Sequence, residues 1–549
     1  MISRQSWNPH GLRTVNPTAW PQYPYDSVPA TPERSVPSYA IQNDWNLELP
    51  MRDGCTILLD VYRPQRPGSR FPALCSFSPY SRQLQRDSAP IGQNEAGITE
   101  FWVPHGYAHV IVDVRGTNGS GGDWPMWGPE EQADIVEVIE WVAAQPWCNG
   151  RVGMTGCSYF GMVQNLAAGR QAPSLTATFP YDALTDIYRD AFFTGGIPSA
   201  WAEFWFTQVQ FLNGTSGRNP NMAAIQRQFQ AILGLEHPFD GPYHQERSAH
   251  TRLADITAPS YFGCDWDFHG LHLSGAFDAW SEVRSPVKRM LIGPKPMPGR
   301  PFAAYHQEAL RWYDLHLKDL DTGVLDGAPI RLWIPGLDEW RGEHEWPLAR
   351  TQWTDFSLGR DGDAGTLSPT APDQTTESVL DYDPAREEWL FGRPELVFRT
   401  EPMTEPMEVT GPVQLTLSMA STASDTDWIV ALCDEAPDGS VRELSRGHLR
   451  SSHREVDPSK GSRNVPWHPH RRAEPLEPGR EVELEIGIVA TSNLFRPGHR
   501  IRLQLANCDS TTRPGALANY RKVLRIPARN TVITGPGKSR LSLPVVVTP

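Results

Sequence analysis

The sequence predicts an α/β fold with a mostly parallel, doubly wound sheet, followed by an all-β domain toward the C-terminal end. Continuous apolar runs such as 107–113 are typical of strands buried on both faces of a parallel sheet. Residues 130–144 place Ile135, Ile139 and Val142 on one helical stripe, so strands and helices alternate here. Strict alternation of apolar and polar residues is found only toward the end of the chain, where it predicts antiparallel strands.

Length and composition limit the class of protein. The 549 residues exceed what one hydrophobic core normally supports, so two or three domains are expected. The formal net charge of −14 argues against nucleic acid as a partner, because phosphate binding needs clustered Lys and Arg. The sequence contains no run of about eighteen apolar residues, so no membrane-spanning helix is expected. No apolar signal segment follows Met1, so a cytoplasmic location is expected.

Neither a metal nor a cofactor is predicted. The seven cysteines are scattered, without a CxxC pair or a Cys/His cluster, which argues against a disulfide framework and a zinc site. The glycine-rich segment 116–122 lacks the Gly-Lys-Ser/Thr ending of a phosphate-binding loop. The expected partner is therefore a small molecule, and a homodimer is compatible with the sequence but not determined by it.

Changes in composition and periodicity divide the chain into six segments. They are an arm at 1–45, the first part of the α/β domain at 46–184, a helical cap insertion at 185–250, the second part of the α/β domain at 251–350, a linker at 351–384 and a β-sandwich or jelly-roll domain at 385–549. The arm is rich in Pro, Ser, Asn and Trp and shows no periodicity. The linker is proposed because Asp, Gly, Thr and Pro dominate its central part.

Each segment contains elements that its pattern predicts. In the α/β domain, strands are expected at 47–51, 56–62, 72–77, 107–113, 151–156, 259–263 and 288–293, and helices at 130–144, 161–168 and 304–317. The cap contains one clear helix, at 221–233, and the last domain contains alternating strands at 413–419, 482–488 and 501–505. Four basic residues of that domain are interpreted as surface residues: Arg446, Arg450, His468 and His470.

Ser158 lies where a nucleophile elbow is expected. The strand at 151–156 and the helix at 161–168 leave only a sharp turn between them, and such a turn has no room for side chains at Gly156 and Gly161. A serine in this turn is raised above the sheet, with the backbone N–H of the next residue directed at a developing oxyanion. The spacing is G-x-S-x-x-G rather than G-x-S-x-G, so a strand-to-helix turn that merely contains a serine is the alternative.

From about residue 46 onward the chain resembles the cocaine esterase and X-Pro dipeptidyl-peptidase group, the CocE/NonD hydrolases. The matching segments are Met51-Arg-Asp-Gly54, Ser78-Pro-Tyr-Ser81, Asp113-Val-Arg-Gly116, Gly156-Cys-Ser-Tyr159, Ile256-Thr-Ala-Pro259, Arg311-Trp-Tyr-Asp314, Gly336-Leu-Asp-Glu-Trp-Arg341, Asp425-Thr-Asp-Trp428 and Pro497-Gly-His-Arg500. The resemblance implies an α/β-hydrolase domain with a helical cap and a C-terminal jelly roll.

The resemblance also implies roles for individual residues. Ser158 corresponds to the nucleophile, and the Tyr80 hydroxyl forms the oxyanion hole beside the Tyr159 amide. Asp267 aligns best with the acid of the triad, and Asp265 is a neighbour that can substitute for it. The alternative interpretations are a strand-end aromatic residue for Tyr80 and loop capping for either aspartate.

The histidine that normally takes the serine proton is missing. The family carries Gly-Pro-x-x-His after the last strand, whereas Lys295, Pro296 and Met297 follow Gly-Pro here. A serine needs an adjacent proton acceptor, because its hydroxyl is a weak nucleophile at its own pKa. Three explanations remain open: another histidine serves (His306, His269 or His272), Lys295 with a lowered pKa serves, or the pocket performs different chemistry.

The resulting functional hypothesis is a serine hydrolase that cleaves a carboxylic ester or amide, including peptide-like substrates, through an acyl-enzyme on Ser158. The alternatives are acyl transfer, cyclisation or elimination on the same scaffold, or a binding protein without catalysis. Two further expectations concern the surroundings of the site. Asp113 and Arg115 are expected to form an ion pair. The cap aromatics line an apolar acyl pocket or pack the cap core, and they are Phe192, Phe193, Trp201, Phe204, Trp205 and Phe206.

Overall fold

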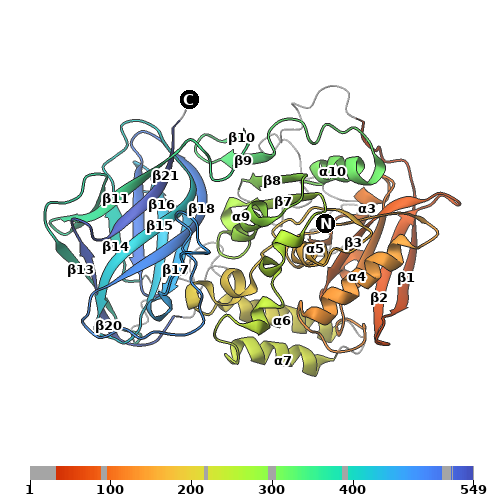
Figure 1. Ribbon diagram of the computed structural model, residues 1–549, viewed down its shortest axis with the longest axis horizontal. Coiled ribbons are helices and arrows are strands. Elements are labelled where there is room, and N and C mark those ends of the chain that lie inside the picture. The colour runs from red at the N-terminus through yellow and green to blue at the C-terminus, as the bar shows by residue number, and fades with distance from the viewer. Residues whose placement is uncertain are drawn as a thin grey trace, which may run out of the picture.

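The computed structural model describes residues 33–87, 95–215, 221–294, 305–385, 393–509, 521 and 523–547. Within these ranges the chain forms two bodies that lie side by side (Figure 1). An α/β domain with helices on both faces of its sheet occupies one side, and an all-β domain formed by the C-terminal part of the chain occupies the other. The expected arm at 1–45 falls mostly outside the described residues, and its last residues belong to the first strand.

The sheet of the α/β domain has the order β1-β2-β4-β3-β5-β6-β7-β8-β9-β10. Its strands are β1 Ile41–Pro50, β2 Thr56–Pro64, β3 Phe71–Ser78, β4 Ala108–Asp113, β5 Cys148–Met154, β6 Leu175–Thr178, β7 Ser260–Asp265, β8 Lys288–Gly293, β9 Ile330–Ile334 and β10 Glu339–Glu343. The strands from β4 to β9 in this order are parallel, while β1, β2 and β10 pair antiparallel at the edges. The parallel strands therefore all end at the same edge of the sheet, where a site is expected.

Helices cover both faces of this sheet. They are α1 Arg82–Arg86, α3 Thr99–Trp102, α4 Pro129–Ala143, α5 Tyr159–Gly169, α9 Leu273–Glu282 and α10 His306–Lys318, with the short helix η7 Trp266–Phe268 after β7. The prediction of a doubly wound α/β domain is confirmed, and every strand and helix expected there has a counterpart. The elements that were not expected are β6, β9, β10, α1, α3 and α9. β6 has only four residues, too few to show a period.

The segment between β6 and β7 is a helical insertion. It contains η3 Ile187–Phe192, η4 Thr194–Gly196, α6 Ala200–Thr215, α7 Met222–Leu233, α8 Pro242–Gln245, η5 Ala249–Thr251 and η6 Leu253–Asp255. The helix expected at 221–233 corresponds to α7, whereas α6 was interpreted as irregular. The prediction missed α6 because aromatic residues are spread around the helix rather than confined to one face. In Figure 1, α6 and α7 lie together at the lower side of the α/β domain.

The C-terminal domain is one eleven-stranded sheet in the order β13-β20-β15-β18-β17-β16-β19-β14-β12-β11-β21. Its strands are β11 Thr351–Asp361, β12 Ala364–Ser368, β13 Thr376–Tyr382, β14 Leu396–Arg399, β15 Met407–Ser421, β16 Asp427–Glu435, β17 Val441–Arg450, β18 Val482–Phe495, β19 Arg500–Ala506, β20 Ala528–Thr534 and β21 Arg540–Val546, with a short helix η9 Ser451–His453. β21 pairs with both β11 and β15, so the sheet closes on itself.

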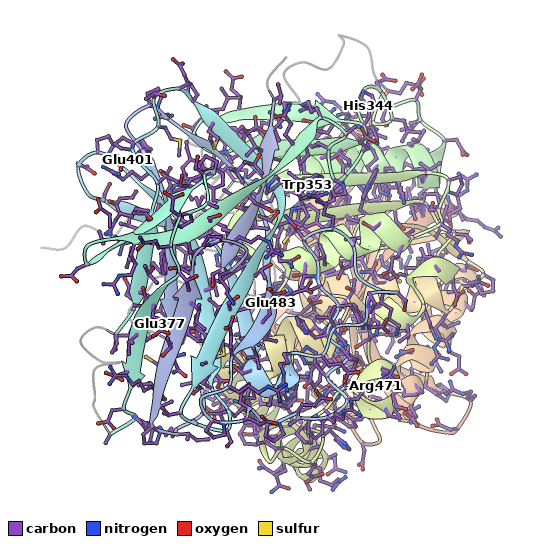
Figure 2. The ribbon with its side chains drawn as sticks, turned by 60° about the vertical axis from the view of Figure 1, so that its left-hand side comes forward. His344, Trp353, Glu377, Glu401, Arg471 and Glu483 are labelled. Carbon is purple, nitrogen blue, oxygen red and sulfur yellow. The ribbon has the colours of Figure 1, made fainter. Side chains whose placement is uncertain are left out.

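The predicted alternation of the C-terminal strands is confirmed. In β18, Leu484, Ile486 and Ile488 point into the core, and Glu483 lies on the outer surface, as Figure 2 shows. The linker predicted at 351–384 is wrong, because this segment contains β11, β12 and β13 of the closed sheet. Its Asp and Gly residues form the turn of the β11–β12 hairpin, where Asp361 pairs with Ala364.

The four basic residues interpreted as surface residues lie inside the protein instead. Arg446, His468 and His470 are all less than 9% exposed, and most of the Arg450 side chain is buried. Arg446 donates from Nη1 to Asp509 at 2.8 Å. β17, which carries Arg446 and Arg450, packs against the helical insertion: a Cβ on Gly195 would lie 2.0 Å from the His448 carbonyl oxygen. The sequence pattern of a single strand does not show whether another domain will cover its outer face.

The ion pair expected between Asp113 and Arg115 is also wrong. Asp113, at the end of β4, accepts a bond of 2.6 Å from Arg82 Nε. Arg115 instead binds Asp134 of α4, with Nε and Nη2 each 2.7 Å from a carboxylate oxygen. The chain turns between these two residues, so their side chains point to different elements. Among the described residues, no helix has the length and apolar character needed to cross a bilayer.

Candidate active site

Ser158 occupies a strained turn between β5 and α5. Its φ of 60° and ψ of −121° lie outside the regions that most side chains adopt. The turn is held because the Ser158 amide donates to the Tyr181 carbonyl oxygen at 3.0 Å, and the Ser158 carbonyl accepts from the amides of Gly161 and Met162. Backbone strain of this kind is typical of the strand-to-helix turn known as a nucleophile elbow.

The two glycines beside the serine are required by close contacts. Gly156 has a φ of +124°, and a Cβ there would lie 2.4 Å from Phe160 Cβ and 2.7 Å from the Glu95 carbonyl oxygen. A Cβ on Gly161 would lie 2.5 Å from the Tyr181 carbonyl oxygen. The spacing G-x-S-x-x-G, one residue longer than G-x-S-x-G, is therefore compatible with a tight turn. Gly161 lies in the first turn of α5 rather than in the loop.

Tyr80 lies next to the elbow because of the strand order. β3 and β5 are parallel neighbours, so the residues that follow their carboxyl ends meet at one edge of the sheet. The Tyr80 ring packs edge-on against the Tyr159 ring, with centroids 6.2 Å apart. Its hydroxyl oxygen accepts a hydrogen bond of 2.9 Å from the indole N–H of Trp205 on α6. Tyr80 is thus a buried residue with a fixed hydroxyl.

Tyr159 contributes differently through its backbone and its side chain. Its amide is at the first position of α5, where an N–H has no partner within the helix and carries part of the positive end of the helix dipole. Its hydroxyl points away into the core and donates to Glu131 Oε1 at 2.6 Å. Glu131 also accepts from the Trp127 amide at 3.1 Å. Burial raises the pKa of Glu131 to about 7, although these two bonds oppose the shift.

Sequence reasoning missed Glu131, although a signal was present. Glu131 lies four residues before Ile135 on the helix α4, so it belongs to the apolar stripe that packs against the sheet. An acidic residue on a buried stripe requires a partner, because a charge without one is costly in the core. The Tyr159 hydroxyl provides that partner.

The raised pKa of Glu131 makes stability depend on pH. Below about pH 4.5 the carboxyl is protonated in both the folded and the unfolded chain; between about 4.5 and 7 only the unfolded chain ionises it. We therefore expect the free energy of unfolding of the parent, relative to Glu131→Gln, to fall by about 3 kcal/mol as the pH rises through this window. Urea unfolding of both proteins at pH 4.5, 6 and 7.5 measures it. If the unfolding free energies of the two proteins change with pH in the same way, the carboxyl at this position is not buried as the structure has it.

The two candidate acids have different environments at the end of β7. Asp265 is fully buried and accepts a hydrogen bond of 3.1 Å from the Tyr181 hydroxyl. Since the Tyr181 carbonyl holds the Ser158 amide, Asp265 is linked to the elbow through this one residue. Asp267 lies in η7 and is exposed. The geometry brings Asp265 closer to the elbow network and leaves Asp267 on the solvent side.

The three histidines considered as the base lie in different parts of the α/β domain. His306 begins α10, and its Nε2 accepts a hydrogen bond of 3.1 Å from the Ile98 amide while its ring stacks on Trp102. To take a proton from Ser158, this nitrogen would have to give up its present bond. His272 is buried immediately before α9, and His269 Nε2 lies 4.0 Å from Glu443 Oε1. Burial lowers the pKa of His269, which the Glu443 carboxylate opposes.

No histidine is hydrogen-bonded to Ser158 within the part of the chain that the structure describes. Lys295, Pro296 and Met297 lie outside the described residues. The structure thus packs Tyr80 against Tyr159 and Phe160, the two residues that follow Ser158, and it adds Trp205 as the partner of Tyr80 and Glu131 as the partner of Tyr159. It does not bring His306 to the serine hydroxyl.

Comparison with known proteins agrees with this arrangement. The family model of the X-Pro dipeptidyl-peptidase (S15 family) matches residues 53–296, and the model of the X-Pro dipeptidyl-peptidase C-terminal non-catalytic domain matches residues 320–541. The chain is 30% identical to the cocaine esterase of Rhodococcus sp. (strain MB1 Bresler), over 91% of this chain and 98% of that protein. The chain belongs to the CocE/NonD and X-Pro dipeptidyl-peptidase family.

Solved structures of CocE/NonD proteins share the fold. A CocE/NonD family hydrolase from Staphylococcus aureus superposes with a TM-score of 0.79 at 23% identity, covering 92% of this chain and 94% of that one. An α-amino acid ester hydrolase superposes with a TM-score of 0.72 at 20% identity, covering 94% and 99%. The likeness extends over both domains, so the α/β-hydrolase-like domain and the all-β domain occur together in these proteins as well.

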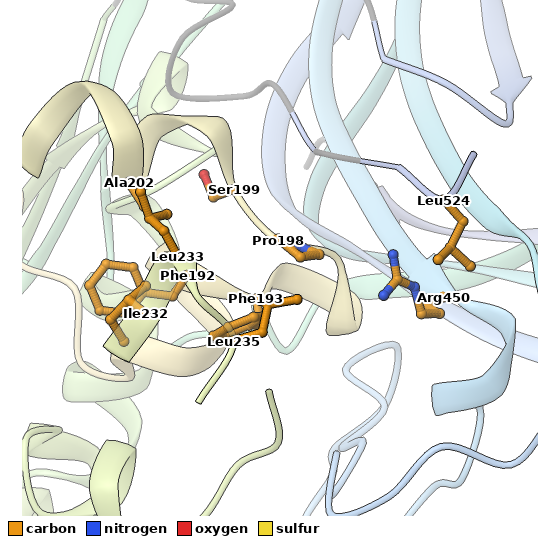
Figure 3. Close-up of a pocket in the computed structure, with 10 residues that line it drawn as sticks. All are labelled: Phe192, Phe193, Pro198, Ser199, Ala202, Ile232, Leu233, Leu235, Arg450 and Leu524. Carbon is orange, nitrogen blue, oxygen red and sulfur yellow. The ribbon is translucent and has the colours of Figure 1, made fainter. Parts of the chain in front are cut away.

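A cavity of about 280 Å³ lies between the helical insertion and the C-terminal domain (Figure 3). It is lined by Phe192, Phe193, Pro198, Ser199, Ala202, Ile232, Leu233, Leu235, Arg450 and Leu524. Six aromatic residues were considered for an acyl pocket. Phe192 and Phe193 face this cavity, Trp205 and Phe206 are buried, Trp201 is partly buried, and Phe204 is half exposed. Ser158 is not among the residues that line this cavity.

Proposed function

We propose that the protein is a serine hydrolase that acts on a carboxylic ester or amide through an acyl-enzyme on Ser158. The observation that carries the proposal is the strained turn at Ser158, which is followed at once by the amide at the start of α5, while the Tyr80 ring packs against the next two residues, Tyr159 and Phe160. Relatives in the family carry the names esterase and Xaa-Pro dipeptidyl-peptidase, which supports an ester or peptide-like substrate.

The proposed chemistry follows from these positions. Ser158 Oγ attacks the carbonyl carbon, and the carbonyl oxygen becomes an oxyanion that accepts hydrogen bonds from the Tyr159 amide and the Tyr80 hydroxyl. The tetrahedral intermediate collapses, the C–O or C–N bond to the leaving group breaks, and the alcohol or amine leaves with a proton. Water then attacks the ester of Ser158, which releases the acid and restores the hydroxyl.

The groups that move the proton are a separate part of the proposal. Asp267 or Asp265 would act as the acid, and His306, His269, His272 or Lys295 as the base. Each is tested by alanine substitution, because removing the base of a triad lowers the rate by several orders of magnitude while leaving the oxyanion hole intact. The structure gives Asp265 one advantage, its link to the elbow through Tyr181.

The proposal is tested with a fluorophosphonate probe, which modifies only an activated serine. We expect the parent to be labelled at Ser158, identified by mass spectrometry of the modified peptide, and Ser158→Ala to show no labelling. Ser81→Ala is a matched control, since Ser81 is a serine beside Tyr80 that has no proposed role. Labelling of the folded parent elsewhere, or not at all, would rule out an activated Ser158.

Non-hydrolytic acyl transfer is the second candidate, favoured by one observation. The sequence carries Lys295, Pro296 and Met297 where the family carries the histidine that activates water for deacylation. The two candidates differ after acylation. With p-nitrophenyl acetate, a hydrolase releases nitrophenol continuously, whereas an acyl transferase releases one equivalent and then waits for an acceptor other than water.

A further inference from the structure

We propose that Trp205, on helix α6 of the insertion, is a positioning residue that holds the Tyr80 hydroxyl in the oxyanion hole. The inference rests on the proposed function of Ser158 and Tyr80, and it assigns to the insertion a part in catalysis beyond enclosing substrate. Trp205 does not itself contact the reacting atoms; it acts through Tyr80.

The hydrogen bond between the two side chains is the first support. Trp205 is 3% exposed and Tyr80 is 7% exposed, and the indole Nε1 lies 2.9 Å from the Tyr80 hydroxyl oxygen. An indole N–H can only donate, so in this pair the phenol oxygen must accept. The proton of the phenol is not used by this bond, and it is the group that an oxyanion needs. Accepting a hydrogen bond also polarises the phenol O–H and makes it a better donor.

The direction of the indole N–H is fixed by a stack of four aromatic rings. Tyr159 stacks on Trp127 with centroids 4.7 Å apart, and Trp127 stacks on Trp205 at 5.1 Å with an interplanar angle of 2°. Trp201 is also nearly parallel to Trp205, at 5.4 Å and 11°, and Tyr159 lies 6.3 Å from it. Packing against these rings restricts the tilt of the indole, so its N–H keeps its direction toward Tyr80.

The stack also connects the insertion to the nucleophile elbow. Its first ring belongs to Tyr159, whose backbone amide is the other proposed oxyanion donor, and its last two rings belong to α6. Both donors are therefore positioned by one layered structure. Ala202, one helical turn before Trp205 on α6, lines the cavity shown in Figure 3, so the helix that holds Tyr80 also borders a space where a small molecule fits.

The inference is tested by a double-mutant cycle on the rate of fluorophosphonate labelling. Tyr80→Phe removes one oxyanion donor and should slow labelling about 100-fold. Trp205→Phe keeps an aromatic ring in the stack but removes the N–H, and we expect about a 10-fold loss. The variant with both substitutions should be no slower than Tyr80→Phe alone, because Trp205 has nothing left to position. Losses that multiply in the double variant would overturn the inference.

Trp312→Phe controls for the general cost of losing a buried indole N–H. Trp312 is also fully buried and donates to the Thr178 carbonyl oxygen at 3.0 Å, on helix α10. We expect it to lower the thermal midpoint as Trp205→Phe does, while the labelling rate of the folded protein stays at the parent value. An equal loss of labelling in both variants would show that Trp205 acts only through stability.

A second measurement separates failure of this inference from failure of the proposed function. In protein with ¹⁵N-labelled tryptophan, the indole signal that disappears in Trp205→Phe should shift upfield in Tyr80→Phe, because the hydrogen bond is lost. If this signal does not move, the Trp205–Tyr80 bond is absent and the inference fails whatever Ser158 does. If it moves but the parent is not labelled at Ser158, the bond exists and the catalytic roles of Ser158 and Trp205 both fail.

Discussion

Arg82→Met is expected to lower the free energy of unfolding by about 3 to 5 kcal/mol, because it leaves the buried Asp113 carboxylate without its counter-charge and removes one of the two arginines that bind Asp60. Arg82 is 4% exposed and binds two carboxylates that are themselves buried, with Nε 2.6 Å from Asp113 and Nη1 2.5 Å from Asp60. Burial already raises the pKa of Asp113 to about 7, and Arg82 is the group that opposes this shift. Urea unfolding at pH 8, where Asp113 is ionised, measures the loss.

Arg63→Met provides the matched comparison. Arg63 also forms an ion pair, with Nε 3.0 Å from Asp44, but both side chains are partly exposed. A pair in contact with solvent contributes at most about 1 kcal/mol, so this variant should unfold almost as the parent does. Equal losses in the two variants would mean that burial does not decide the value of the Arg82 pairs.

The Arg82 substitution should also reach the active site. Arg82 lies two residues after Tyr80, and its Nε bond of 2.6 Å to Asp113 ties the Tyr80 loop to the end of β4. The bond from its backbone amide to Asp113 remains in the variant, so the side-chain bond is the anchor that is lost. Loss of this anchor frees the loop that carries an oxyanion donor. We therefore expect slower labelling of Ser158 in the fraction that remains folded, in addition to the loss of stability.

The sequence was informative where a local pattern determines the structure. Apolar runs predicted the parallel strands, and Gly156 with Gly161 predicted the elbow, because each of these patterns occupies a short stretch of sequence. Gly362 and Asp363, interpreted as part of a linker, instead form the turn of a hairpin. Composition alone cannot tell a turn between paired strands from a flexible connection, since both use the same residues.

Contacts between segments that are far apart along the chain could not be predicted from the sequence. Trp205 and Tyr80 are 125 positions apart, and nothing local indicates that the indole of one meets the hydroxyl of the other. The same holds for Arg446, which is buried only because β17 packs against the α/β domain. The absence of the family histidine was visible in the sequence, but its replacement depends on the three-dimensional surroundings of Ser158.

Gly156→Ala is the second substitution with a large expected effect, on stability and on the nucleophile together. The φ of +124° disfavours any side chain at this position, and the added Cβ would lie 2.4 Å from Phe160 Cβ and 2.7 Å from the Glu95 carbonyl oxygen. Strain of this kind costs about 1 to 3 kcal/mol, and relieving the contacts adds a similar amount. We expect a loss of about 3 kcal/mol or more in unfolding free energy, measured with urea.

Gly150→Ala distinguishes the two parts of this cost, because Gly150 has a φ of +91° but no atom within 4 Å of an added Cβ. It should lose only the backbone part, about 1 kcal/mol, and keep full labelling of Ser158. In Gly156→Ala the elbow can relieve the contact only by moving Phe160, which follows Ser158 by two residues, so labelling should fall at least 10-fold even where the protein is folded. If both alanine variants label Ser158 at the parent rate, the serine does not need the strained elbow, and the reactivity proposed for it must have another source.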